Sequence, residues 1–88
     1  MRITGIKIRK TFPLGNVKAL ISITLDDCIA VHDIKIMQGT KRIYVSMPRR
    51  RYSDGTLHDI VHPIKPATRM TLENEVLTAY TDYVLKDV

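Results

Sequence analysis

The segment from residue 17 to 25, VKALISITL, alternates its side chains with a period of two. The positions of one face are all apolar, namely Val17, Ala19, Ile21, Ile23 and Leu25. The intervening positions are mostly polar, and because successive side chains along a strand point to opposite faces, the pattern predicts a half-buried β-strand. A chain that contains this segment must build a sheet around it, with one face turned to a core.

Three other segments have the same strand character. Ile6 and Ile8 alternate with Lys7 and Arg9 near the N-terminus, and β-branched residues are frequent in the two later segments. The turns that separate these strands are expected at Asp26-Asp27 and at 38–41, because Asp and Gly favour turn dihedrals. The predicted strands are RITGIKIRK (2–10), CIAVHDIKIM (28–37) and RIYVSM (42–47).

A short fifth strand is predicted at 56–61, TLHDIV, after Pro48 ends the fourth strand. Residues 49–55 are then the loop of a hairpin, and Asp54-Gly55 is its turn signal. His62-Pro63 closes the fifth strand.

The spacing of the apolar residues changes in the last 20 or so residues. Apolar side chains recur at every fourth position, which predicts an amphipathic helix with a stripe of Leu72, Val76, Tyr80 and Val84. Pro66 suits the first turn of this helix, and Thr68 or Thr71 can cap it. Tyr80 and Tyr83 lie on or beside the stripe, so we expect both rings in the core.

The predicted fold is therefore α+β: an antiparallel sheet of four to five strands with one C-terminal helix covering a face. The 88 residues, 1–88, are expected to form a single domain. A chain of this length buries only about 60% of its unfolded surface, and association is a common remedy. We expect a symmetric homodimer, in which the long, regular strand at 17–25 is available to pair with another chain.

Cysteine content and hydrophobicity suggest a location. Cys28 is the one cysteine of the chain, so there is no internal disulfide, and a reducing compartment is favoured. The apolar residues near the N-terminus alternate and form no continuous run, so neither a secretory signal nor a membrane span is predicted. We expect a cytoplasmic protein.

The net charge of +5 is unevenly distributed. Residues 1–51 contain 11 Lys and Arg against 3 Asp and Glu, a balance of +8, whereas residues 52–88 contain 3 against 6, a balance of −3. Such asymmetry suggests a basic surface built by the first part of the chain, which would attract polyanions.

The histidines and carboxylates raise the alternative of a metal-dependent hydrolase. His32-Asp33 and His58-Asp59 are adjacent pairs, and His62 follows. Adjacent side chains on a strand point apart, and positions four residues apart on a strand lie about 13 Å from each other, so these residues do not converge on one ion. The sequence also lacks a glycine-rich phosphate loop and an activated nucleophile. We predict no enzyme, no metal and no cofactor, with buried hydrogen bonds and a fixed chain reversal as the roles of His32, Asp33, His62 and Pro63.

The stretch PRRRYSDG, from residue 48, carries the strongest functional signal. Guanidinium groups bind phosphates through two hydrogen bonds, and an aromatic ring can stack on an unpaired base. Arg49, Arg50 and Arg51 are therefore predicted to bind phosphates, with Tyr52 stacking beside them. Lys7 and Arg9 would extend the basic surface, and Lys10 and Arg69 are weaker candidates.

Several motifs, in order and at similar spacing, resemble those of the SpoVG family (stage V sporulation protein G, septation regulators). They cover nearly the whole chain and are SITLDD, AVHDIKI, VSMPRRR, DG, HDIVHPI, Arg69 and VLTAY. The run from VHDI through MP to HPI is specific. The resemblance implies a small bacterial α+β protein that dimerises, binds DNA and also RNA, and regulates septation and gene expression.

Three features depart from that family's pattern. Arg49, Arg50 and Arg51 stand where relatives tend to have a serine and mixed Lys and Arg, and His58 replaces a basic residue. The C-terminal helix is acidic, so we expect the arginine loop and the first strand to carry the binding.

The sequence leaves two classes of function open beside that of a regulator linked to septation and cell division. One is a protein-interaction module whose basic loop docks an acidic partner, for example a division or regulatory protein, without binding nucleic acid. The other is the metal-dependent hydrolase considered above. DNA and RNA both remain open as targets.

Overall fold

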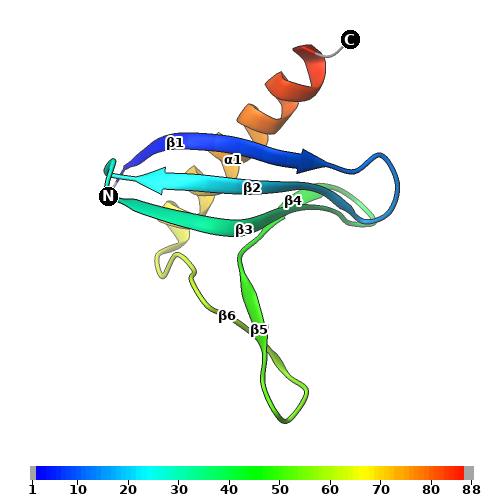
Figure 1. Ribbon diagram of the computed structural model, residues 1–88, viewed down its shortest axis with the longest axis vertical. Helices are drawn as coiled ribbons and strands as arrows, with labels where there is room; N and C mark the ends of the chain where they lie inside the picture. The colour runs from blue at the N-terminus through cyan, green and yellow to red at the C-terminus, as the bar shows by residue number, and fades with distance from the viewer. Residues whose placement is uncertain (1, 87–88) are drawn as a thin grey trace.

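The protein is described by a computed structural model, which covers residues 2–86. Four strands form an antiparallel sheet in the order β1-β2-β3-β4, and two short strands form a separate sheet (Figure 1). A single helix follows them. The elements are β1 (Ile3–Thr11), β2 (Val17–Leu25), β3 (Ile29–Gln38), β4 (Ile43–Ser46), β5 (Arg49–Arg51), β6 (Leu57–Asp59) and α1 (Pro66–Lys86). The predicted α+β class, with an antiparallel sheet and a C-terminal helix, is confirmed.

The period-two segment occupies the centre of the sheet. β2 pairs with β1 on one side and with β3 on the other, with Ile21 opposite both Ile8 and Ile34. Ala19, Ile21 and Ile23 are almost fully buried. Because both edges of β2 are already hydrogen-bonded, the expectation that this strand pairs with another chain is wrong.

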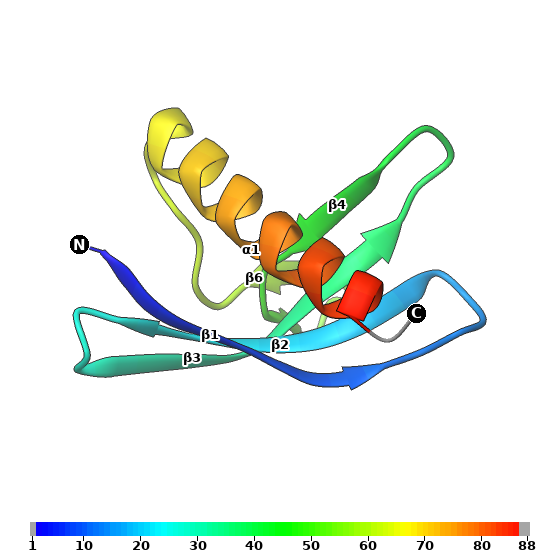
Figure 2. The ribbon, with the colours of Figure 1, turned by 90° about the horizontal axis from the view of Figure 1, so that it is seen from above.

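Helix α1 lies across one face of the sheet (Figure 2) and contacts β1 and β4. Leu72 and Val76 pack into the same core as the inward-facing residues of β2 and β3. Tyr80 is partly buried against this core, as predicted, but Tyr83 is 42% exposed. The last turns of α1 extend beyond β1 (Figure 1).

Pro66 is the first residue of α1, as expected. Neither threonine caps the helix, because Thr68 and Thr71 lie inside it. The hydroxyl of Thr71 instead donates to the carbonyl oxygen of Ala67, one turn earlier, at 3.1 Å.

A β-bulge interrupts the pairing of β2 with β3. Ile21 pairs with Ile34 but Ile23 pairs with Val31, so Ser22 on β2 faces the two residues His32 and Asp33. Asp33 takes up the extra length with a φ of 63°. His32 Nδ1 lies 2.8 Å from Ser22 Oγ, a hydrogen bond that fits the predicted structural role of His32. The contact is only partly buried, and His32 and Asp33 are exposed residues, so the predicted full burial is not found.

The turn between β2 and β3 forms at Asp26-Asp27, as predicted. Both residues have positive φ, 50° and 54°, and Cys28 N donates to Leu25 O at 2.9 Å, the pattern of a type I′ turn. The Asp26 carboxylate accepts a hydrogen bond from Arg2 N at 2.8 Å. The turn is therefore tied to the start of β1.

Replacing Asp27 by glycine is expected to raise the free energy of unfolding by up to about 1 kcal/mol. Glycine adopts positive φ without the steric cost borne by an L-residue, and only the backbone N–H of Asp27 bonds Thr4. The measurement is urea denaturation. Asp26→Gly is the matched control, since it also removes the steric cost of a positive φ but loses the carboxylate that accepts from Arg2 N. A larger increase in the free energy of unfolding for Asp26→Gly than for Asp27→Gly would contradict a stabilising role of that hydrogen bond.

The segment after β4 differs from the prediction. Arg49–Arg51 form strand β5 instead of a loop, and Leu57–Asp59 form β6, so the predicted fifth strand is three residues long. It pairs with the arginines and does not extend the main sheet. The reason is geometric: the chain turns out of the sheet at Pro48, which has no N–H to donate to a ladder.

Candidate nucleic-acid interface

The two short strands form a projecting β-hairpin, residues 48–60, which we call the basic arm. Ile60 N donates to Pro48 O at 2.8 Å, which closes the base of the arm. Further out, the pairs are Arg49 with Asp59, Arg50 with His58 and Arg51 with Leu57. Figure 1 shows the arm extending away from both the main sheet and α1. Residues 49–58 and Ile60 are exposed, so the arm is accessible to a partner from both faces.

The tip of the arm is ordered by its own residues. Tyr52 N donates to Thr56 O and Gly55 N donates to Tyr52 O, each at 2.9 Å. Gly55 has a φ of +87°, a conformation that favours glycine, so the predicted Asp54-Gly55 turn is confirmed. Asp54 Oδ1 accepts from Thr56 N at 2.9 Å and from Thr56 Oγ1 at 2.6 Å.

These hydrogen bonds predict an acid-sensitive tip. The Thr56 hydroxyl, followed by the Thr56 backbone N–H, favours the ionised carboxylate and lowers the pKa of Asp54 below its ordinary value of 3.8. Since this pKa is lower in the folded than in the unfolded chain, the stabilisation is present above the ordinary value and is lost as the pH falls through the lowered one.

The test is a carbon-13 NMR titration of the Asp54 carboxyl in wild type and in Thr56→Val. The valine variant keeps the backbone donor and loses the hydroxyl, so its titration midpoint should lie higher than that of wild type. Identical midpoints in the two proteins would contradict the assigned cause.

The three arginines do not share one face. Side chains alternate along a strand, so Arg49 and Arg51 lie on the face of Leu57 and Asp59, while Arg50 lies on the face of His58. A phosphate chain that runs along one face of the arm therefore meets either one arginine or two. The three arginines are consecutive in the sequence, but the strand pairing places them on two opposite faces of the arm.

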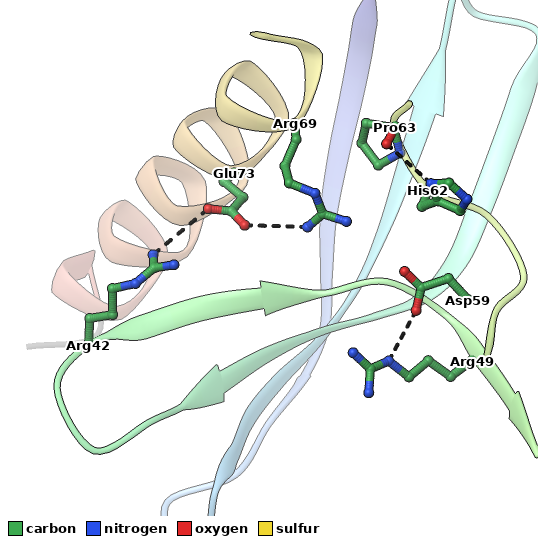
Figure 3. A network of polar contacts seen from close by, with 7 residues as sticks. All are labelled: Arg42, Arg49, Asp59, His62, Pro63, Arg69 and Glu73. Carbon is green, nitrogen blue, oxygen red and sulfur yellow. Dashed lines mark hydrogen bonds and ion pairs between the residues drawn. The ribbon is translucent and has the colours of Figure 1, made fainter. Parts of the chain in front are cut away.

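The guanidinium groups also differ in their surroundings. Arg49 Nε donates to Asp59 Oδ1 at 3.1 Å, an ion pair on the surface (Figure 3). An Nη of Arg51 donates to Gly55 O at 3.0 Å. Arg50 has no ion pair with any of residues 2–86 and is exposed, so its charge is the least compensated of the three.

Tyr52 lies against His58, a residue that the sequence analysis did not assign to the site. The two rings are stacked, with centroids 4.3 Å apart and planes inclined by 28°. His58 Nε2 is also 2.8 Å from Thr56 Oγ1. Alternation along the sequence places Arg50 and Tyr52 on one face of the hairpin. Placing His58 on that same face also requires the strand register, which the sequence did not give.

The basic residues of the first strand lie elsewhere. β1 and β4 are opposite edges of the main sheet, and the arm leaves from β4, so Lys7, Arg9 and Lys10 are not brought beside the arm. Lys7 pairs with Ser22 and Lys10 with Leu20, which places both lysines on the sheet face away from α1. The predicted continuous basic surface is therefore two separate basic surfaces.

A third lysine shares that open face. Leu20 pairs with Lys10 on one side and with Lys35 on the other, so the two lysines flank Leu20 in one row across three strands. Arg9 lies at an irregularity of the β1–β2 register and is exposed. The sequence analysis did not assign Lys35, although the alternation of β3 could have placed it opposite the core.

Arg69 lies on α1, and its charge is largely compensated. Its guanidinium is 3.6 Å from Glu73, one turn along the helix, and Glu73 also lies 3.8 Å from Arg42 (Figure 3). Two arginines therefore share one carboxylate on this surface. Arg69 is half-buried and is separate from the Arg49–Asp59 pair, so the structure does not bring it into the arm.

The three histidines take part in local hydrogen bonds. His62 Nδ1 is 3.2 Å from the carbonyl oxygen of Pro63, and this contact is exposed, so the expected buried hydrogen bond is not found at His62. Within residues 2–86, no group of three or more His, Cys, Asp or Glu side chains is placed to hold a metal ion.

A hollow of about 490 Å³ lies beneath the first turns of α1. Most of its lining is apolar and continues the core, with Ile23, Leu25, Val31 and Met47 on the sheet side. Its polar lining residues are Arg2, His62, Thr68, Thr71 and Glu75. His62 Nδ1 lies 3.2 Å from Pro63 O and the Thr71 hydroxyl donates to Ala67 O, and within residues 2–86 no hydrogen bond joins His62 to either threonine as a nucleophile–base pair would require. The arm is the more distinctive chemical feature of the surface.

For residues 2–86, α1 is not apolar enough to cross a membrane.

Together, the fold and the arm define a small α+β protein in which a helix-covered antiparallel sheet carries a basic β-hairpin. The SpoVG family model matches residues 1–82. The chain belongs to the SpoVG family.

Relatives of high similarity carry the description "Putative septation protein SpoVG". The protein of Agathobacter rectalis is 48% identical over 80 residues, which cover 91% of this chain and 92% of the relative. The protein of Desulforudis audaxviator is 46% identical over 80 residues, with 91% of each chain covered. That of Staphylococcus carnosus is 40% identical over 89 residues, covering 99% of this chain and 83% of the relative. The resemblance inferred from the sequence motifs is confirmed.

Proposed function

We propose that the protein is a nucleic-acid-binding regulator linked to septation, the process named in its relatives' descriptions, to cell division and to gene expression. The observation that supports this proposal is the projecting basic arm, in which Arg50 is exposed and uncompensated beside the stacked rings of Tyr52 and His58. Guanidinium groups bind phosphate and aromatic rings stack on bases, so the arm combines the two chemistries that nucleic acid requires.

The test is a direct titration of the purified protein against a fluorescently labelled DNA and an RNA of the same sequence. Binding to either that weakens as salt increases supports the proposal, because phosphate contacts release condensed counterions. Failure to bind both, together with binding to an acidic peptide, would replace it with the protein-docking alternative.

We propose further that the chain acts as a homodimer. Apolar side chains remain exposed along the arm, directly after it and on the last turns of α1, namely Leu57, Ile60, Val61, Tyr83, Val84 and Leu85. Association would remove such a surface from water, and a symmetric dimer is the commonest way to do so. Sedimentation at micromolar concentration is expected to give twice the mass of the 88-residue chain, and a monomer would reject the dimer.

The same proposal assigns structural and positioning roles, and no catalysis, to the histidines. The imidazoles of His32 and His58 lie within hydrogen-bond distance of hydroxyl groups, Ser22 Oγ and Thr56 Oγ1. These bonds support structural and positioning roles. A location in the cytoplasm belongs to the same proposal, since the predicted DNA or RNA target is found there.

A further inference from the structure

One face of the basic arm carries a layered arrangement of side chains. Arg50 and Tyr52 are two positions apart on one side of the hairpin, and His58 pairs with Arg50 from the other side. The ring of His58 stacks on that of Tyr52 at a centroid distance of 4.3 Å. Tyr52 remains 52% exposed, so the tyrosine is accessible to a ligand although its ring is supported by the imidazole.

A chain of hydrogen bonds fixes the imidazole in this position. The Thr56 hydroxyl is 2.6 Å from Asp54 Oδ1, and an ionised carboxylate only accepts, so the hydroxyl donates to Asp54. Toward His58 the hydroxyl oxygen must then accept, and His58 Nε2 donates to it across 2.8 Å. Asp54 thus orients Thr56, Thr56 orients His58, and His58 supports Tyr52.

We infer that Tyr52 and His58 form a preformed stacking platform for an unpaired nucleobase, with Arg50 binding the adjacent phosphate, so that the preferred target is single-stranded nucleic acid. His58 is a positioning residue: it holds the tyrosine ring in place before the ligand arrives, which reduces the ordering cost of binding. The inference rests on the proposed function and adds the class of target and the role of His58.

Duplex and single strand differ in what they offer this platform. In a duplex, each base is stacked on its neighbours and paired, and its faces are not accessible to a protein ring. A single strand offers the face of each base, and stacking on an aromatic side chain is tolerant of base identity. Phosphate contacts, in contrast, are available from both forms. Removing the platform should therefore reduce binding to single strands selectively.

The experiment uses the full chain and two fluorescently labelled probes, a 12-nucleotide single strand of mixed sequence and the duplex of that sequence. Wild type should bind the single strand more tightly. Tyr52→Ala should weaken single-strand binding by roughly 5- to 150-fold, the range measured for loss of one stacked base, and change duplex binding little. His58→Ala should weaken it in the same selective way, and His58→Phe should restore most of the affinity because the supporting ring returns.

Met70→Ala is the control, since Met70 is a large side chain that is 65% exposed on α1, outside the arm and outside the apolar surface proposed for the dimer. Circular dichroism should show that all variants remain folded. Equal affinities of wild type for the two probes, with no selective loss in Tyr52→Ala or His58→Ala, would overturn the platform and leave the proposed function standing. Absence of binding to either probe would overturn both. If His58→Phe binds as weakly as His58→Ala, the imidazole does not act by supporting the tyrosine ring, and its positioning role is rejected.

Discussion

Simultaneous replacement of Arg49, Arg50 and Arg51 by alanine is expected to abolish most of the salt-dependent affinity of the protein for nucleic acid. Each arginine that binds a phosphate displaces condensed counterions, so the logarithm of the affinity falls linearly with the logarithm of the salt concentration. The variant loses up to about three phosphate contacts per chain, or about six in a dimer that uses both arms. The slope should flatten by about 2–5 units.

Because the arginines lie on two faces of the arm, separate variants can measure the contribution of each face to the salt dependence. Arg50→Ala removes the uncompensated charge from the face of His58, whereas the double variant Arg49→Ala, Arg51→Ala removes the charges of the opposite face. Because Arg49 already pairs with Asp59, we expect Arg50 alone to contribute more to the slope than Arg49 alone.

Arg42→Ala is the matched control for these variants. Arg42 is also an exposed arginine, but it pairs with Glu73 and lies outside the arm. Its removal should leave the slope unchanged. All of these surface substitutions should alter the free energy of unfolding by less than about 0.5 kcal/mol, which urea denaturation can verify. Equal slopes and affinities in the triple variant and in wild type would show that the arm binds no phosphate.

The largest expected effect on stability comes from Ile21→Ala. Ile21 is fully buried in the central strand and is flanked by Ile8 and Ile34. Truncating a buried isoleucine to alanine costs about 2–5 kcal/mol, because apolar contacts are lost and a cavity remains. For a domain of this size, each kcal/mol lowers the Tm by about 4–8 °C, so we expect a decrease of roughly 8–40 °C.

Ile29→Ala is the matched control for this substitution. It removes the same atoms from the start of β3, where the side chain is 49% exposed. We expect a loss of less than about 1 kcal/mol for Ile29→Ala, measured by thermal and urea denaturation. Similar losses at Ile21 and Ile29 would mean that the core is not centred on β2.

Local patterns were sufficient for much of this fold. Alternation over 17–25 predicted a strand with one buried face, Asp26-Asp27 predicted the turn, and the four-residue spacing from Leu72 to Tyr80 predicted the helix and its buried side. Each of these features depends on residues near one another in sequence, whose dihedral preferences and side-chain periods are set by short-range sterics and hydrogen bonds. The basic run at 49–51 was visible for the same reason.

Other features depend on which segments meet in space. The order β1-β2-β3-β4 buries both edges of β2 and separates Lys7 from the basic arm. Register in the arm divides Arg50 from Arg49 and Arg51, and brings His58 against Tyr52. The position of α1 relative to the sheet leaves Tyr83 exposed although it lies beside the apolar stripe. Strand pairing, register and helix placement are selected by the burial of apolar surface over the whole core. A shift of one residue in register would exchange the two faces of a strand. These features therefore cannot be predicted from any short stretch of the chain.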